Sequence, residues 1–116
     1  MHTVVVTPSY LAAAKSTRMS EVVRLEIVKA LAVDPSAGDL IRGTHGPRKL
    51  RHARPGQGKS GGYRVITYFH SAGLPVFLIT VFGKNQKANL TKAEAIALGE
   101  MTKAIATNYT KKEQRR

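Results

Sequence analysis

The sequence predicts one α+β domain in which helices pack on a mostly antiparallel sheet. The expected elements follow in the order strand, two helices, three strands and a helix, without a repeat or a long linker. With 116 residues, the chain is the usual size of one domain with one hydrophobic core. The sequence contains no cysteine, which excludes disulfide frameworks and thiolate metal sites and fits a reducing, cytoplasmic location.

The first third of the chain predicts a short strand and then a helical hairpin. Residues 2–6 are rich in β-branched side chains, and the strand ends at Thr7-Pro8 because proline disfavours further pairing. Alanine-rich residues 10–15 predict the first helix, and residues 18–33 predict the second. The second helix is expected to bury one stripe of side chains: Val23, Ile27, Ala30 and Leu31.

Three strands are expected next, as an antiparallel meander over residues 48–54, 63–70 and 75–82. Glycine-containing loops over residues 36–46 and 55–62 flank the first of these strands. Residues 76–81 are apolar at almost every position, which predicts a central strand covered on both faces.

A C-terminal helix completes a domain that we expect to span residues 1–110. Thr91 and Glu94 have the spacing of a capping box at its start, and its predicted core stripe is Ala97, Met101, Ala104 and Ile105. Residues 111–116 are expected to form a basic, frayed tail. No segment approaches the roughly 20 apolar residues that cross a bilayer, and no signal leader opens the chain, so we expect a soluble protein without a membrane partner.

Charge is the strongest compositional signal. The chain has 19 Lys and Arg against 7 Asp and Glu. No acidic residue lies between Leu40 and Ala93, and ten basic residues do: Arg42, Arg48, Lys49, Arg51, Arg54, Lys59, Arg64, Lys84, Lys87 and Lys92. A solvated surface kept for solubility is one interpretation, but segregation into one segment favours a polyanionic partner such as RNA.

Residues 53–60 satisfy a relaxed phosphate-binding-loop pattern that ends in Gly58-Lys59-Ser60. Such a loop works because it enters a helix whose N-terminal dipole faces the phosphates. Here Gly61-Gly62 and a predicted strand follow instead, so nucleotide hydrolysis is not expected. The glycines still allow backbone to approach a phosphodiester, or they simply form a hairpin loop.

The usual catalytic constellations are weak. The four histidines have neither metal-ligand spacing nor a neighbouring acid pair, so we expect no metal and no other cofactor. A ribonuclease without metal needs neither group, because RNA carries its own nucleophile in the 2′-hydroxyl. The protein must align this hydroxyl with the phosphate, neutralise the developing charge and manage two proton transfers, and Arg and Lys side chains suit that work.

Four blocks in the middle half of the chain resemble the RelE family of toxins, specifically its HigB branch within the RelE/ParE superfamily. The blocks are residues 38–44, Arg48-Lys49-Leu50-Arg51, residues 58–66 and Val81-Phe82-Gly83-Lys84-Asn85. The resemblance implies a RelE-like fold and the toxin of a type II toxin–antitoxin system. It implies a ribosome-dependent, metal-independent mRNA endonuclease that inhibits translation. The implied partners are the ribosome, mRNA and a helix-turn-helix antitoxin.

The resemblance also implies roles for individual residues. Arg64 matches the family's strand arginine that stabilises the scissile phosphate, and Lys84 matches a basic position at the same site. Arg51, Arg54 and Lys59 are candidates for proton transfer and phosphate contact. Further contacts to RNA are expected from Arg48, Lys49, His52, Arg54, Tyr68 and Lys87. Each basic residue also suits a nonspecific contact, and Tyr68 suits the core of the sheet as well as base stacking.

Two other function classes stay open, the first because it shares the charge pattern and the second because it shares the fold. A binding module without catalysis predicts association with ribosomes and an intact message. A toxin of the ParE branch has the same fold but inhibits DNA gyrase, which predicts topoisomerase-linked DNA damage instead of RNA breaks.

Overall fold

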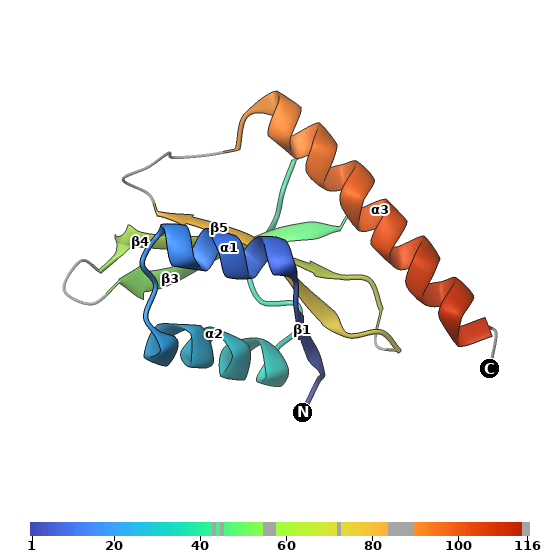
Figure 1. The fold of residues 1–116 in the computed structure, drawn as a ribbon, viewed down its shortest axis with the longest axis horizontal. Coiled ribbons are helices and arrows are strands. Elements are labelled where there is room, and N and C mark those ends of the chain that lie inside the picture. The colour runs from blue at the N-terminus through green and yellow to red at the C-terminus, as the bar shows by residue number, and fades with distance from the viewer. Residues whose placement is uncertain (43, 45, 55–57, 72, 84–89, 115–116) are drawn as a thin grey trace.

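The computed structural model describes residues 1–42, 44, 46–54, 58–71, 73–83 and 90–114 (Figure 1). Its elements in chain order are β1 (Val4–Val6), α1 (Pro8–Ser16), α2 (Glu21–Val33), β2 (Asp39–Leu40), β3 (Pro47–Arg54), β4 (Gly58–Phe69), β5 (Val76–Gly83) and α3 (Lys92–Gln114). The predicted α+β class and element order are therefore confirmed. Within the described residues, no helix combines the length and apolar character that crossing a membrane requires.

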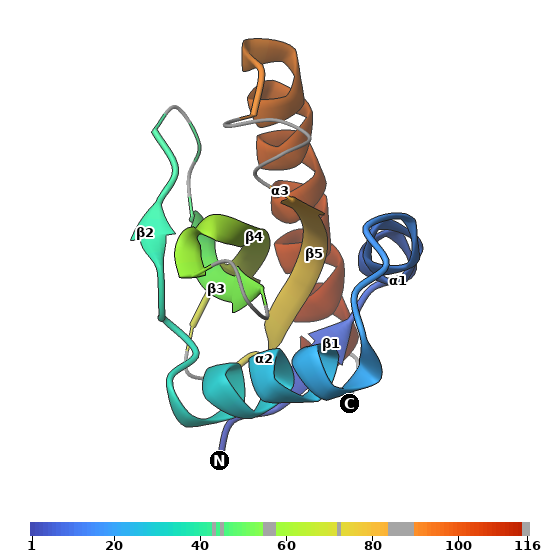
Figure 2. The ribbon, with the colours of Figure 1, turned by 90° about the vertical axis from the view of Figure 1, so that its left-hand side faces the viewer.

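The five strands form one sheet in the order β1-β5-β4-β3-β2. The β3, β4 and β5 strands make the expected antiparallel meander, and β1 pairs with β5 in parallel. Figure 2 shows β2 at one side of the molecule and α1 at the other, with β3, β4 and β5 between them. Strand β2 is a two-residue addition inside the segment that the sequence predicted as a loop.

The helices start where capping residues end the extended backbone. Thr7 accepts a hydrogen bond from the Tyr10 N–H and Pro8 occupies the first turn, so α1 begins two residues earlier than predicted. Arg18 has a left-handed φ of 58°, and Ser20 caps the next helix by accepting from the Val23 N–H. Helix α2 therefore starts at Glu21, three residues later than predicted, and the two helices form a hairpin with crossed axes (Figures 1 and 2).

Two hydrophobic layers cover the sheet. The layer under α1 and α2 includes Tyr10, Ile27, Leu31, Val65 and Leu78. The layer under α3 includes Ile66, Tyr68, Phe77, Ile79 and Leu98. Alternate residues of β5 thus enter opposite layers, which confirms that this apolar strand is covered on both faces.

The capping box of α3 is confirmed. The Thr91 N–H donates to Glu94 Oε1 at 2.9 Å, and the Glu94 N–H donates to Thr91 Oγ1 at 3.1 Å. Ile105 of the predicted core stripe packs against the core, but the rest of the stripe was displaced by one position, because Leu98 and Thr102 are buried while Ala97, Met101 and Ala104 are exposed. Helix α3 also continues to Gln114, through most of the segment that the sequence assigned to a frayed tail.

The glycine-rich loop is shorter than the sequence predicted. Residues 58–62 belong to β4, so the prediction of a loop over them was wrong. Extended pairing tolerates these glycines because they sit next to a register irregularity between His52 and Arg54 of β3.

Candidate nucleic-acid interface

The register between β3 and β4 brings three cationic residues to one face of the sheet. Arg51 pairs with Arg64, and Lys49 pairs with Ile66. Directly paired residues share a face, and side chains alternate along each strand. Ile66 belongs to the hydrophobic layer under α3. Lys49, Arg51 and Arg64 therefore lie on the face that α3 covers in part, and we call these three residues the cation face.

The pairing of Arg51 with Arg64 places two positive charges opposite each other, which lowers the stability of the folded state. Like charges directly opposite each other in a sheet are destabilising. Arg64 is only 3% exposed and donates from Nη1 to the Tyr63 carbonyl at 3.4 Å, whereas Arg51 is exposed. A fold that holds a buried and an exposed arginine side by side gains from an anion at that position.

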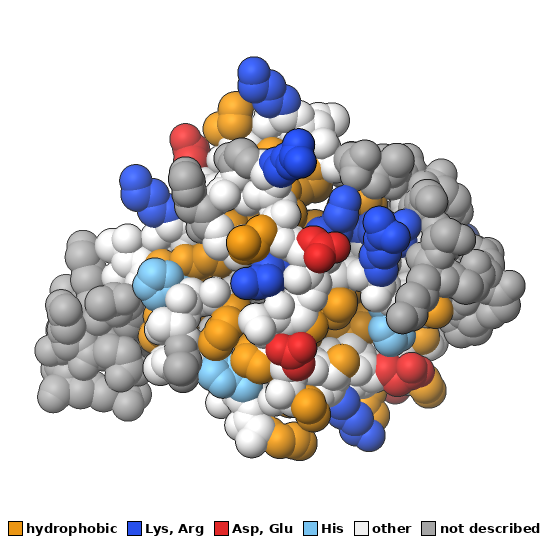
Figure 3. Space-filling view, turned by 180° about the vertical axis from the view of Figure 1, so that it is seen from behind, with side chains coloured by type: hydrophobic (Ala, Val, Ile, Leu, Met, Phe, Trp, Pro, Cys, Tyr) orange, Lys and Arg blue, Asp and Glu red, His pale blue; other side chains and the backbone are white. Residues whose placement is uncertain are grey.

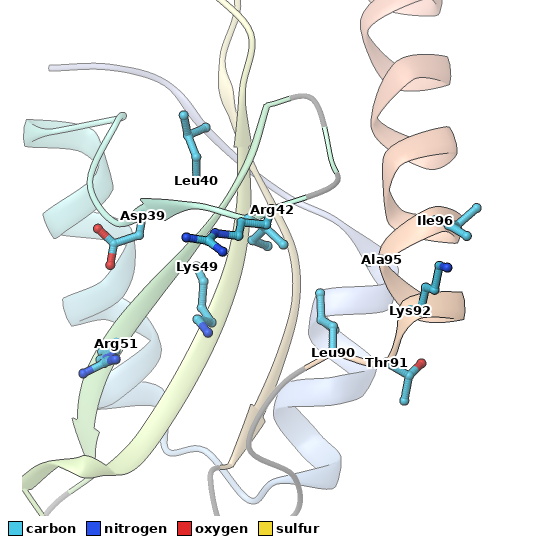
Figure 4. A pocket seen from close by; sticks show the side chains of 11 residues that line it. Asp39, Leu40, Arg42, Lys49, Arg51, Leu90, Thr91, Lys92, Ala95 and Ile96 are labelled. Carbon is cyan, nitrogen blue, oxygen red and sulfur yellow. The ribbon is translucent and has the colours of Figure 1, made fainter.

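A cleft of about 530 Å³ opens next to these cations (Figure 4). The segment around β2, strand β3 and the first turn of α3 form its walls. Its charged and polar lining residues are Asp39, Arg42, Lys49, Arg51, Thr91 and Lys92. Its apolar lining residues are Leu40, Ile41, Leu90, Ala95 and Ile96. The cleft thus combines four cations with an apolar surface, which suits a ligand that has phosphates and flat rings.

Two of the residues predicted to bind RNA lie elsewhere. Arg48 pairs with Thr67, and its Nη1 donates to the Gly38 carbonyl at 3.2 Å. His52 pairs with Tyr63, and its Nε2 lies 3.6 Å from Glu26 Oε2 of α2. Because side chains alternate along β3, Arg48 and His52 lie on the face of the sheet opposite Lys49 and Arg51.

Tyr68 is part of the core. Tyr68 is 4% exposed, and its hydroxyl lies 3.2 Å from His70 Nδ1. Its ring is stacked on that of Phe77, with 6.5 Å between the ring centroids. Burial raises the pKa of the Tyr68 hydroxyl above its usual value. In this conformation the ring has no free face for a nucleobase.

For four of the predicted site residues the structure gives no side-chain position. Lys84 and Lys87 lie outside the described residues. Arg54 and Lys59 belong by their backbones to the paired ends of β3 and β4, next to the cation face. Among the described residues, no group of three or more His, Asp or Glu side chains is arranged to hold a metal ion.

The sequence placed Arg42 and Lys92 in the basic segment without a role at the site, and it gave Asp39 no role. These residues reach the cleft because β2 pairs with β3 and because α3 begins at the opposite wall. Strand β2 has only two residues, which is too few to give a periodic pattern of apolar residues in the sequence. Figure 3 shows the molecule from behind, where Lys and Arg side chains are spread over much of the described surface with carboxylates among them.

Comparison with known proteins identifies the family. Residues 9–115 match the family model of the RelE toxin of the RelE/RelB toxin–antitoxin system. The fold is similar to that of the Escherichia coli toxin RelE, solved in the free state as a double arginine-to-alanine mutant. The TM-score is 0.53 at 20% sequence identity, and the match covers 83% of this chain and 95% of the other. Because the family model spans nearly the whole chain, this protein belongs to the RelE family of toxins.

Proposed function

We propose that this toxin is a ribosome-dependent endoribonuclease of the HigB branch that cuts mRNA in the cytoplasm and so inhibits translation. The observation that carries the proposal is the gathering of Lys49, Arg51 and Arg64 on one face of the sheet, beside a cleft lined by further cations. A helix-turn-helix antitoxin is proposed as its partner, on the basis of the sequence resemblance.

The chemistry needs no bound cofactor. The ribose 2′-hydroxyl loses its proton to a base and attacks the adjacent phosphorus. The bond to the 5′-oxygen of the next nucleotide breaks, and that oxygen takes up a proton. The products are a 2′,3′-cyclic phosphate and a free 5′-hydroxyl. The enzyme contributes alignment and positive charge around the phosphorane-like transition state.

Of the paired arginines Arg51 and Arg64, Arg51 is the one that a phosphate in the cleft can reach, because it is exposed and lines the cleft. Its guanidinium offers a fork of N–H donors to two phosphate oxygens. Arg64 is buried on the paired strand and adds positive potential at the same position. Lys49 lies on the same face and is a candidate for proton transfer, as is Lys59 from the sequence, and Lys84 is proposed as a further basic group at this site.

The test is a reconstituted translation reaction with purified toxin. Message breaks are mapped by primer extension with and without ribosomes, and the fragment ends are analysed chemically. We expect breaks only when ribosomes are present, and we expect the upstream fragments to end in a 2′,3′-cyclic phosphate. Chelation of trace transition metals should not reduce cleavage of message on ribosome complexes that were formed beforehand. Intact message with the toxin bound to ribosomes would instead support a binding module, and intact message without binding would direct the test to DNA gyrase.

A further inference from the structure

Helix α2 exposes a row of side chains on the side that faces away from the hydrophobic layer. The row consists of four exposed residues that follow at spacings of four, three and four: Val22, Glu26, Lys29 and Val33. This spacing places them along one side of a helix. Val22 is 69% exposed and Val33 is 76% exposed, and Leu25, at 54%, flanks the row. Single exposed apolar residues are normal, but several on one helix side indicate a contact surface.

The hairpin of α1 and α2 differs in charge from the rest of the molecule. Residues 8–34 contain four basic and three acidic residues, whereas the whole chain has a formal net charge of +12. Two copies of this chain repel each other unless they meet at a surface with little net charge. An acidic partner protein, in contrast, is attracted to the cations on the other elements. The nearly neutral hairpin is therefore the surface that suits a second copy.

We propose that α2 pairs in antiparallel orientation with α2 of a second copy, around a two-fold axis that passes between Ile27 and Val28. In this arrangement Val22 lies opposite the partner's Val33. Glu26 lies opposite the partner's Lys29. The two-fold axis repeats each contact, so the interface has apolar contacts at both ends and two ion pairs in the middle. The inference concerns self-association and does not depend on the proposed RNA cleavage.

The charges of the row favour antiparallel over parallel pairing. Parallel pairing would place Glu26 opposite the same carboxylate of the partner and Lys29 opposite the same ammonium group, and like charges repel. Glu26 Oε2 also lies 3.6 Å from His52 Nε2, but 56% of the Glu26 side chain is exposed and can take a second contact. Exposed ion pairs contribute little affinity, so their effect is on orientation.

The proposed pairing leaves the cation face accessible. Helix α2 packs on one hydrophobic layer of the sheet, and the cation face lies on the side of the other layer, under α3. A dimer formed through α2 thus carries its two cation faces on its outer sides. A 13-residue helix offers a small interface, which predicts a weak dimer whose population depends on protein concentration.

The first experiment reverses the two charges of the row in separate chains. Glu26→Lys and Lys29→Glu each place like charges across the interface, so each variant alone should self-associate at least about tenfold more weakly than wild type. When the two variants are mixed, opposite charges face each other again, and heterodimers should form about as tightly as the wild-type dimer. Sedimentation equilibrium from micromolar to millimolar protein measures these affinities, and melting temperatures show that the variants are folded.

Glu100→Lys and Lys103→Glu are the matched controls, because these exposed α3 residues have the same spacing and their reversal changes the net charge equally. Both controls should self-associate like wild type. A wild-type toxin that stays monomeric throughout would overturn the proposal, as would folded α2 variants that do not associate in the mixture. A monomeric toxin whose α2 amides are protected only in a complex with its antitoxin would assign the row to that partner instead.

The second experiment tests orientation and uses the absence of native cysteine. Val22→Cys mixed with Val33→Cys should form a disulfide-linked heterodimer under mild oxidation. Neither variant alone should form one, because antiparallel pairing separates identical positions by roughly 16 Å along the helix axis, which is too far for a disulfide. Disulfides of Val22→Cys with itself, or none in the mixture, would contradict antiparallel pairing. This experiment also decides if a charge variant does not fold.

Discussion

The paired like charges on the cation face are unfavourable for folding, and in the proposed function they are favourable for binding a phosphate. Arg51 and Arg64 stand opposite each other on paired strands, and Lys49 lies two residues before Arg51 on the same face. Charges placed in this way are expected at a functional site, where stability is exchanged for ligand recognition.

Replacing Arg51 with alanine should therefore separate activity from stability. We expect Arg51→Ala to lower the single-turnover rate of message cleavage about 100-fold, because it removes charge stabilisation in the transition state. The free energy of unfolding in urea should stay unchanged or rise slightly, because the repulsion with Arg64 is relieved. Lys29→Ala, on the exposed side of α2, is the control for loss of one charge. A destabilised Arg51→Ala variant with normal cleavage would show that Arg51 is structural.

The buried tyrosine of α1 predicts a pH dependence. Burial, opposed by the charge of Arg24, raises the pKa of Tyr10 to about 12. The unfolded chain loses this proton near pH 10 while the folded chain keeps it, so stability should fall as the pH rises from about 10 to about 12. Melting temperatures across this range should fall less steeply for Tyr10→Phe than for wild type. Parallel curves would mean that Tyr10 does not titrate as its burial suggests.

At the scale of elements, the cleft depends on how closely β2 approaches β3. Gly38 has a φ of 97°, and a Cβ atom there would lie 2.8 Å from the Lys49 carbonyl oxygen. Only glycine fits this approach without a shift of the backbone. The same contact places Asp39 opposite Lys49 and so shapes one wall of the cleft.

A Gly38→Ala substitution should separate β2 from β3. We expect it to cost roughly 1–3 kcal/mol of unfolding free energy, measured in urea, and to weaken nucleotide binding in the cleft. Gly73→Ala is the matched control, because nothing lies within 4 Å of its added Cβ and its φ is not positive. Equal stabilities for the two variants would contradict the close approach.

The secondary-structure elements could largely be predicted from the sequence, but the pairing of the strands and the contacts between the elements could not. The apolar run over residues 76–81 identified β5, the extended basic segment over residues 48–54 was correctly predicted as β3, and the Thr91–Glu94 spacing identified the start of α3. Sequence periodicity alone did not identify β2, which has two residues and is held by pairing with β3. The same pairing gathers Lys49 and Arg51 with Asp39, while strand alternation sends His52 and Arg48 to the other side. Which cations share a face depends on the register of the strands, whereas the sequence shows the basic residues only as one continuous segment.

At the scale of the whole molecule, a formal net charge of +12 predicts strong electrostatic attraction to RNA. Binding to ribosomes should weaken as salt rises, with a linear relation between the logarithms of affinity and salt concentration. Lys49→Ala should reduce the slope by about one, and Lys29→Ala should leave it nearly unchanged. Affinities at four or more salt concentrations test this, and equal slopes for both variants would contradict a localised RNA face.

The central claim is that RNA meets the cleft between β2, β3 and α3 and not the face formed by α1 and α2. The most direct measurement uses the absence of native cysteine to place one photo-crosslinker at a time. Ile96→Cys lies on the cleft wall at 55% exposure, and Val22→Cys lies on α2 at 69% exposure, so the two apolar sites are well matched. On ribosomes programmed with radiolabelled message, we predict crosslinks to mRNA from position 96 and none from position 22. Crosslinks from position 22 alone would place the RNA on the opposite face and contradict the account.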